Sequence, residues 1–238
     1  RLARHQTATN ASQHAAALRS YLRYRATCGD AVGELTVVIQ NPVHWKLASL
    51  PRALAPDEIK RLLESFTTRY RWPKRCYAII RCALDLGLRS GEIAGLKIGD
   101  IDWRAGTVTL KGTKSLRQDI LPLSMETGQA LADDLQYERP HSTSPSVFVM
   151  HRGDHDRGMT AGAVRGVIGW AYRRIGLKHT RSHALRHTFA CRLVERGSSL
   201  KEVADLLRHR SLNSTLIYAK LDTPKLAAVA LPWPGSAA

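Results

Sequence analysis

Two imidazoles, a guanidinium and a phenol lie within one short stretch of the sequence: His183, Arg186, His209 and Tyr218. Together such groups can act on a phosphodiester. An arginine can hold the phosphate oxygens, a histidine can move a proton and a tyrosine can attack phosphorus. A tyrosine hydroxyl has a free pKa of about 10, so its attack at neutral pH needs a base or a strongly activated phosphate.

The helix predicted around Arg186 starts at Thr180 or Ser182, either of which can cap its N-terminus, and stops at Gly197. Its apolar arc consists of Leu185, Phe189, Ala190, Leu193 and Val194. Arg186 falls inside this arc, with His183 beside it.

A guanidinium that faces the core cannot shed its charge and needs an anionic partner. Near a helix N-terminus, a bound phosphate is one candidate partner for Arg186. For this residue taken alone, the favoured interpretation is an arginine that reaches solvent or pairs with a core carboxylate.

The next helix opens with a capping box from Ser199 to Glu202 and is expected to run to about His209. A further element then begins and carries Tyr218. Each residue has a structural alternative: Tyr218 could be an ordinary half-buried tyrosine, and His209 could interact with a helix C-terminus. Only the four residues taken together indicate a catalytic site.

Further cations precede this stretch. Arg89 lies in a turn just before Ser90, which can cap a helix beginning at Gly91, although Arg89 could instead neutralise the end of the preceding helix. Lys111 and Lys114 lie in the predicted turn of a hairpin. Either lysine could serve a reaction or lie in water.

The other expected elements position these groups. A basic helix covers residues 10–27 and closes near Gly29, with an apolar face that includes Leu18, Tyr21 and Leu22. Residues 33–56 carry several prolines and are expected to form a linker. The remaining predictions are helices at 56–63, 73–86, 124–137 and 160–175, strands at 107–110 and 118–123, a loop at 138–159 with a short strand at 147–149, and a short helix after Asp222.

The charge balance points to a polyanionic partner. The 238 residues contain 36 Lys and Arg against 20 Asp and Glu, which gives a formal net charge of +16, and 44% of the residues are hydrophobic. A packed, strongly basic chain favours nucleic acid as its ligand. An anionic membrane surface is the second candidate, but no basic amphipathic helix stands out to bind it.

The four cysteines have no regular spacing, which is typical of reduced thiols in a cytosolic protein: Cys28, Cys76, Cys82 and Cys191. The sequence shows no signal peptide and no long apolar run, so we expect neither secretion nor membrane insertion. It does not begin with Met, which is compatible with a fragment.

Four motifs together resemble the catalytic domain of the tyrosine recombinases, the phage-integrase family. They are LGLRSGEIAGLKIGDID, LKGTKSLRQDILPL, SHALRHTFACRLVERG and LLRHRSLNSTLIYAKL, in the family's order and spacing. The resemblance runs from about residue 54 to 222, and residues 10–48 resemble the last part of the family's helical DNA-clamping domain. It implies a mainly α fold with a small antiparallel β-sheet (α+β). The expected domains are a partial helical arm with linker at 1–50, the catalytic domain at 51–222 and a C-terminal tail at 223–238, docked on a neighbouring protomer or on its own domain.

The resemblance also implies roles for individual residues. The expected catalytic set is Arg89, Lys111, His183, Arg186, His209 and the nucleophile Tyr218, with Glu92 supporting the first arginine and Lys114 as the rival lysine. Arg19 and Arg23 are expected to contact DNA. Arg208 stands where the family usually has glycine, and it could either add a phosphate contact or close the approach of the DNA backbone.

By the same resemblance, the tyrosine attacks a DNA phosphate, forms a 3′-phosphotyrosyl bond and frees a 5′-hydroxyl, and a second strand reverses the step. Such site-specific recombination and integration, often of mobile elements, needs no metal or nucleotide cofactor. The expected partners are double-stranded DNA and further copies of the chain in a tetrameric synapse, with no membrane. The expected location is the bacterial cytoplasm, at the nucleoid.

Three alternatives remain open at this stage. One is relaxation of supercoiled DNA like that of a type IB topoisomerase, and another is a fragment that only binds DNA. The third is a zinc site, because His183, His187 and Cys191 share a helix face and His209 could complete a tetrahedron. The sequence lacks the Glu of a zinc hydrolase motif, and Arg186 would place a cation beside the metal.

Overall fold

The computed structural model describes residues 8–40, 52–67, 71–111, 118–177, 182–209 and 214–221. The chain divides into two compact units, Arg1–Ser49 and Leu50–Ala238, which are described separately below. The assignment of an arm, a catalytic domain and a tail to the sequence remains a prediction, and the predicted helix after Asp222 lies outside the described residues.

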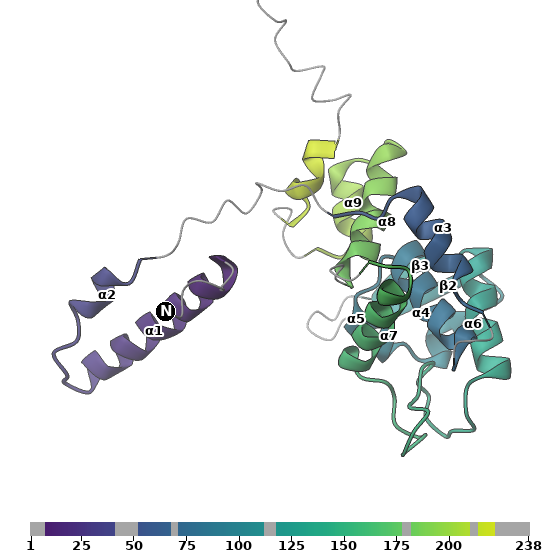
Figure 1. Cartoon of the computed structure of the whole chain (residues 1–238), viewed down its shortest axis with the longest axis horizontal. Coiled ribbons are helices and arrows are strands. Elements are labelled where there is room, and N and C mark those ends of the chain that lie inside the picture. Colours follow the sequence, from purple (N-terminus) through teal and green to yellow (C-terminus); the bar gives the residue numbers. More distant parts are fainter. Residues whose placement is uncertain are drawn as a thin grey trace, which may run out of the picture. The chain divides into compact units, whose positions relative to one another are not determined.

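The first unit consists of α1 (Ala8–Thr27) and α2 (Leu35–Val38), drawn in purple in Figure 1. Helix α2 lies inside the segment that was predicted to be an irregular linker. The Arg19 guanidinium donates a hydrogen bond to the carbonyl of Ile39 at 2.9 Å, which joins the two helices. The apolar face predicted for α1 is only partly buried within this unit, because Leu22 is covered while Leu18 and Tyr21 are exposed.

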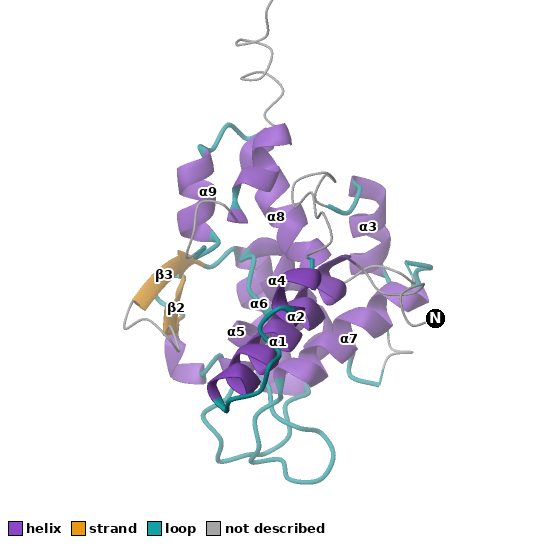
Figure 2. Ribbon diagram, turned by 90° about the vertical axis from the view of Figure 1, so that its left-hand side faces the viewer, coloured by secondary structure: helices purple, strands orange, loops and turns teal. Residues whose placement is uncertain are grey.

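The second unit is mainly helical with one small sheet, as predicted (Figures 1 and 2). Its α-helices are α3 (Pro56–Glu64), α4 (Pro73–Asp85), α5 (Ser90–Gly95), α6 (Met125–Tyr137), α7 (Ala161–Arg174), α8 (His183–Glu195) and α9 (Leu200–Leu206). The 3₁₀-helices are η2 (Ile98–Asp100) and η4 (Leu216–Leu221), and the strands are β1 (Ile101–Asp102), β2 (Thr107–Lys111) and β3 (Gln118–Pro122).

The three strands pair antiparallel in the order β1-β2-β3. Val108 pairs with Leu121, and both side chains are buried, so the alternation of the strands places one face on the core. Lys111 is the last residue of β2 and pairs with Gln118. It therefore belongs to the strand, whereas the sequence had placed it in the turn.

Several helix starts follow from local sequence. Pro56 opens α3, and the Glu58 carboxylate accepts the backbone N–H of Ala55 at 2.9 Å. The hydroxyls of Ser124, Thr160 and Ser199 cap α6, α7 and α9, each by accepting a backbone N–H three residues on. The capping box at Ser199 was predicted from the sequence, and Ser124 and Thr160 are the first residues of the helices predicted at 124–137 and 160–175.

Helix α4 lies at the centre of the larger core and packs against α6, α7 and α8. Ile79, Ile80 and Leu84 on α4 are almost completely buried. Figure 2 shows β2 and β3 at one side of these helices. A second, smaller cluster joins α8, α9 and η4 and contains Ala190, Cys191, Val194, Val203, Leu207 and Tyr218.

All four cysteines are free thiols. In the part of the chain that the structure describes, no helix has the length and apolar character needed to span a membrane.

Candidate active site

The turn between α4 and α5 passes close to α8 at Gly87. Gly87 has a φ of +59°, and a Cβ at this position would lie 2.6 Å from Cδ1 of Phe189. Only glycine permits this close approach, because any other residue would collide with the α8 side chain. The approach brings the Gly87 carbonyl within reach of Arg186 on α8.

Arg89 occupies the N-cap position of α5, and Ser90 is the first helical residue. The carboxylate of Glu92 reaches back to accept the backbone N–H of Arg89 at 2.7 Å. The predicted Ser90 cap is therefore wrong by one residue, because the Glu92 carboxylate satisfies the helix N-terminus instead of the serine hydroxyl.

Arg186 lies inside the apolar arc of α8, as its spacing predicted, and is only 5% exposed. Its guanidinium donates hydrogen bonds to the carbonyls of Gly87 and Leu207, and Nη1 lies 4.0 Å from Oε2 of Glu92. Burial lowers the pKa of Arg186 to about 9, with the charge of Arg89 acting in the same direction and Glu92 opposing it. The guanidinium thus stays charged at neutral pH.

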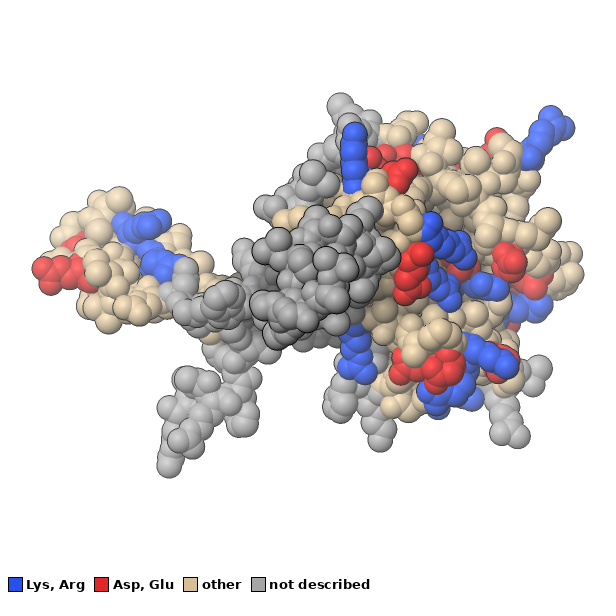
Figure 3. Space-filling view, turned by 90° about the horizontal axis from the view of Figure 1, so that it is seen from above, with Lys and Arg blue, Asp and Glu red and all other residues tan. Residues whose placement is uncertain are grey.

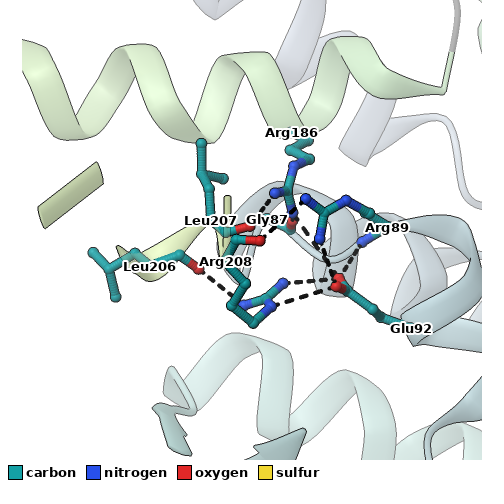
Figure 4. Close-up of polar contacts among 7 residues, drawn as sticks. All are labelled: Gly87, Arg89, Glu92, Arg186, Leu206, Leu207 and Arg208. Carbon is teal, nitrogen blue, oxygen red and sulfur yellow. Dashed lines mark hydrogen bonds and ion pairs between the residues drawn. The ribbon is translucent and has the colours of Figure 1, made fainter. Parts of the chain in front are cut away.

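Arg89 reaches the same carboxylate from the solvent side. Its Nη1 donates to Oε1 of Glu92 at 2.8 Å, and the side chain remains 38% exposed. Figure 4 shows the guanidinium groups of Arg89, Arg186 and Arg208 converging on Glu92. We call these four residues the arginine cluster. The two arginines singled out from the sequence therefore face one shared anion.

Arg208 ends α9 in a Schellman motif. Its φ is +53°, its N–H donates to the carbonyl of Asp205, and the N–H of His209 donates to the carbonyl of Ala204. Because this left-handed residue stops the helix, α9 ends at Leu206 rather than near His209 as predicted. A non-glycine residue in this conformation costs roughly 1–2 kcal/mol.

The Arg208 side chain is turned inward and is 10% exposed. Its Nη2 donates to Oε2 of Glu92 at 2.8 Å, and its Nη1 donates to the carbonyl of Leu206 at 2.9 Å. The backbone carbonyl of Arg208 also accepts Nη2 of Arg89 at 3.4 Å. Arg208 is thus tied to the other arginines by both its side chain and its backbone.

Glu92 is the single carboxylate of the arginine cluster. Burial by itself would raise its pKa, but the hydrogen bonds and charges of Arg208 and then Arg89 outweigh burial, so the pKa lies below its ordinary value. The cluster therefore combines three guanidinium groups with one carboxylate and keeps an excess of positive charge at neutral pH. Planar guanidinium forks match the oxygens of a phosphate.

His209 follows Arg208 directly and links the end of α9 to the η4 segment. Its Nδ1 lies 2.6 Å from the Thr215 hydroxyl oxygen. Burial, together with the neighbouring charges of Arg186 and Arg89, lowers the pKa of His209 to about 4. This imidazole is therefore neutral at physiological pH and can accept a proton or a hydrogen bond.

Tyr218 lies on η4 within the smaller core cluster and is only 2% exposed. Its hydroxyl lies 2.7 Å from Nδ1 of His187 on α8. Burial raises the pKa of Tyr218 to about 12, although the charge of Arg186 opposes this shift. Burial also lowers the pKa of His187, with help from His183 and Arg186. A protonated phenol therefore contacts a neutral imidazole.

The contact between His187 and Tyr218 was missed from the sequence, which had placed His187 only in the zinc hypothesis. The position directly after Arg186 was the one available signal, since it puts the imidazole beside a residue of the site. A separation of 31 residues to Tyr218 gives no local pattern, so only folding reveals this pair.

The other predicted site residues are more scattered. His183 is exposed at the first turn of α8. Nζ of Lys111 lies 2.9 Å from Oδ1 of Asp100, and the lysine side chain is 60% exposed. Lys114 lies outside the described residues. Arg19 and Arg23 belong to the first unit, so their relation to the arginine cluster is not described.

The zinc hypothesis gains no support from the described residues, which contain no group of three His, Cys, Asp or Glu side chains able to hold a metal ion. Nδ1 of His187 is directed at the Tyr218 hydroxyl, and Nδ1 of His209 is directed at Thr215. The proposed ligands therefore do not converge, although three of them share one helix.

A protein-family model described as the phage integrase family matches residues 52–224. The chain is 35% identical to the putative integrase/recombinase y4rA of Sinorhizobium fredii over 93% of this chain and 54% of that protein. It is 29% identical to the tyrosine recombinase XerC of Pelobacter propionicus over 90% of this chain and 69% of that protein. It thus spans about half the length of the first of these relatives.

Solved structures share this architecture. The crystal structure of XerA recombinase aligns with a TM-score of 0.65 and 23% identity over 82% of this chain and 69% of that chain. XerH site-specific recombinase in a post-cleavage complex with palindromic difH substrate aligns with a TM-score of 0.64 and 25% identity, over 76% of this chain and 52% of that chain. The second unit of this chain therefore has the fold of these recombinases.

Proposed function

Because this chain belongs to the phage integrase family, we propose that it cuts and rejoins DNA strands at specific sites through a covalent tyrosine–phosphate bond. The match to the family includes the whole arginine cluster and Tyr218. The proposal extends to the whole reaction, including its DNA substrate and its protein partners.

The convergence of Arg89 and Arg186 on one anionic position carries this proposal. Phosphodiester transfer builds negative charge on the non-bridging oxygens, and preorganised donors aimed at that charge supply the largest catalytic effect. Both guanidinium groups contact or approach the Glu92 carboxylate, at 2.8 and 4.0 Å. A phosphate beside this carboxylate would meet the exposed side of Arg89 and the charge of Arg186.

Tyr218 is the proposed nucleophile. Its oxygen attacks phosphorus and displaces the 5′-oxygen of the next nucleotide, and the phenolic proton passes to an imidazole, for which His187, His183 and His209 are candidates. The buried phenol is protonated and covered in the described structure. Attack on DNA therefore requires the Tyr218 hydroxyl to become accessible, and His187 can serve as the base only if the two side chains stay in contact until the proton moves.

Lys111 is the proposed donor of a proton to the leaving 5′-oxygen. It sits at the end of β2, where its exposed ammonium group pairs with Asp100. The free 5′-hydroxyl of a second strand then attacks the phosphotyrosyl bond and regenerates the phenol. Each step exchanges one phosphate ester for another, so the energy of the broken bond is retained and no nucleotide cofactor is required.

Double-stranded DNA is the proposed substrate, and several copies of the chain are proposed to act together on it. The net charge of +16 supports binding to a polyanion. On the visible face in Figure 3, Lys and Arg are interspersed with Asp and Glu rather than gathered in one continuous patch. The neighbour XerH was solved with difH substrate, and a Tn1549 transposon integrase with transposon end DNA. In a bacterium this action takes place at the nucleoid.

The direct test is covalent capture of DNA. The protein is incubated with a library of nicked suicide duplexes whose half-sites are randomised, and the trapped adducts are sequenced and mapped by peptide mass spectrometry. We expect an adduct at Tyr218 that is lost in Tyr218→Phe. Tyr137→Phe is the matched control, because Tyr137 is an exposed tyrosine on α6.

The outcomes separate the alternatives. Recovery of one preferred DNA sequence supports site-specific recombination, whereas relaxation of supercoiled DNA without sequence preference indicates an enzyme like a type IB topoisomerase. DNA binding without any adduct indicates a binding fragment. An adduct that persists in Tyr218→Phe removes Tyr218 from the role of nucleophile.

A further inference from the structure

Arg208 occupies a backbone position that suits glycine better than arginine. Among the described non-glycine residues, Arg208 alone has a positive φ, and it fills the C′ position of a Schellman motif, where glycine is the usual residue. The strain of this conformation has to be offset by the surrounding structure, and the Arg208 side chain makes several contacts that can contribute. Those interactions lead into the arginine cluster.

The Arg208 guanidinium is already occupied on all three nitrogens. Nη2 and Nε lie 2.8 and 3.4 Å from the Glu92 carboxylate oxygens, and Nη1 donates to the Leu206 carbonyl. The side chain is nearly buried. Three of its five N–H donors are thus engaged on a side chain that is nearly buried, so a direct contact with DNA phosphate would require the guanidinium to turn away from Glu92.

Glu92 in turn contacts both arginines that face the proposed phosphate. It accepts the backbone N–H and Nη1 of Arg89 and lies 4.0 Å from Nη1 of Arg186. The left-handed backbone of Arg208 also directs its own carbonyl at Nη2 of Arg89. Figure 4 shows these contacts arriving at Glu92 from separate elements.

We propose that Arg208 is a positioning residue for phosphate binding: it clamps Glu92, and through Glu92 it fixes the guanidinium groups of Arg89 and Arg186. Its own guanidinium does not bind DNA. This inference rests on the proposed function for its purpose, but the clamp itself is a property of the free protein. The sequence had left open whether Arg208 contacts a phosphate or blocks the approach of the DNA backbone. The proposed role, positioning of Glu92, differs from both.

The clamp can be measured without DNA. Glu92 is titrated by ¹³C NMR of its side-chain carboxyl, assigned by comparison with Glu92→Gln, in the wild type, Arg208→Gly, Arg208→Lys and the exposed control Lys201→Ala. Loss of a close cation should raise the pKa of Glu92 by about one unit or more in Arg208→Gly. Lysine should restore part of the shift, and the control should match the wild type.

Arg208→Gly is expected to fold, since glycine fits this backbone without strain, and circular dichroism verifies this. An unchanged Glu92 titration in a folded Arg208→Gly protein overturns the proposal. This readout stays valid if no covalent adduct with DNA is ever found, so failure of the clamp and failure of the proposed function are distinguishable.

The salt dependence of DNA binding separates positioning from direct contact. With a mixed-sequence duplex, removal of a phosphate contact lowers the slope of log affinity against log salt by about one. We expect Arg208→Gly to leave this slope unchanged and to reduce the rate of adduct formation at least tenfold. A slope lowered by about one would show that Arg208 touches DNA and would overturn the proposal.

A double-variant cycle tests whether Arg208 acts through Glu92. In the Glu92→Gln background, Arg208→Gly should cause no further loss in the rate of adduct formation. Losses that multiply independently would show that the two residues act separately, against the proposed clamp.

Discussion

Two arginines of the larger unit are almost equally buried, yet their surroundings differ. Arg186 on α8 and Arg75 on α4 are 5% and 6% exposed. Arg186 donates to two backbone carbonyls and lies near an ionised carboxylate. The Arg75 guanidinium donates one long hydrogen bond of 3.5 Å to the Val149 carbonyl, and its central carbon lies 4.5 Å from the centre of the Trp72 ring.

The carboxylates near these arginines differ in the same way. Glu92 is bonded by two arginines, and its pKa is lowered. Both carboxylate oxygens of Asp134, and Nε of Arg75, have no hydrogen-bond partner among the described residues. Burial raises the pKa of Asp134 to about 7, although the charge of Arg75 opposes this.

The comparison shows that burial of charged side chains does not by itself produce a site with a constant charge. Around Arg186, three separate elements supply partners that hold each charge fixed at neutral pH. Around Asp134, desolvation exceeds the available compensation, so the charge varies with pH. The constant positive charge of the arginine cluster suits the binding of an anion. Arg75 and Asp134, in contrast, are polar side chains buried in the core with few partners.

The largest expected contrast is catalytic. Arg186→Lys keeps a positive charge but loses the bidentate fork, so we expect the rate of adduct formation to fall on the order of 10²- to 10³-fold with little change in DNA affinity. Arg75→Lys should change this rate only a few-fold. Single-turnover capture and a binding titration measure both. Equal losses of rate and affinity in Arg186→Lys would instead indicate a binding role.

The second contrast concerns stability at the arginine cluster. Glu92→Gln leaves three guanidinium groups without their anion, and we expect a loss on the order of 3 kcal/mol at pH 8. The Glu92 pKa is depressed on folding, so its stabilisation is present above the unfolded pKa and disappears as pH falls through the folded pKa. Denaturant unfolding of the variant and the wild type should therefore converge in acid. A loss independent of pH would contradict this.

Asp134→Asn should act with the opposite sign. The pKa of Asp134 is raised on folding, so its contribution is complete below the unfolded value and is lost as pH rises through about 7. At pH 8 the variant should be more stable than the wild type by on the order of 1–2 kcal/mol, and this gain should vanish near pH 4. A destabilised variant at pH 8 would mean that the ionised carboxylate has gained a partner.

The smallest expected effect comes from the neutral pair beside Arg186. His187→Phe removes the partner of the buried Tyr218 hydroxyl and should cost about 1 kcal/mol in unfolding free energy. The same substitution in a Tyr218→Phe background should cost less, because no polar hydroxyl remains unpaired. Thermal unfolding of the four proteins gives the coupling. An equal cost in both backgrounds would show that His187 contributes by packing alone.

Much of this molecule was readable from local sequence. The caps at Ser124, Thr160 and Ser199 depend on hydrogen bonds three residues away, so they appear as short patterns. The burial of Arg186 followed from helical periodicity alone. The early stop of α9 was missed, because the left-handed backbone of Arg208 is stabilised by Glu92, which lies 116 residues away in sequence.

The sequence by itself determined where most of the longer helices begin and which chemical groups are present, since capping, periodicity and charge are properties of neighbouring residues. Tertiary structure alone decided that Arg89, Arg186 and Arg208 share one carboxylate and that the Tyr218 hydroxyl meets His187. These contacts join groups contributed by α5, α8, the end of α9 and η4. Their geometry is fixed only when burial of the two hydrophobic clusters brings those elements together.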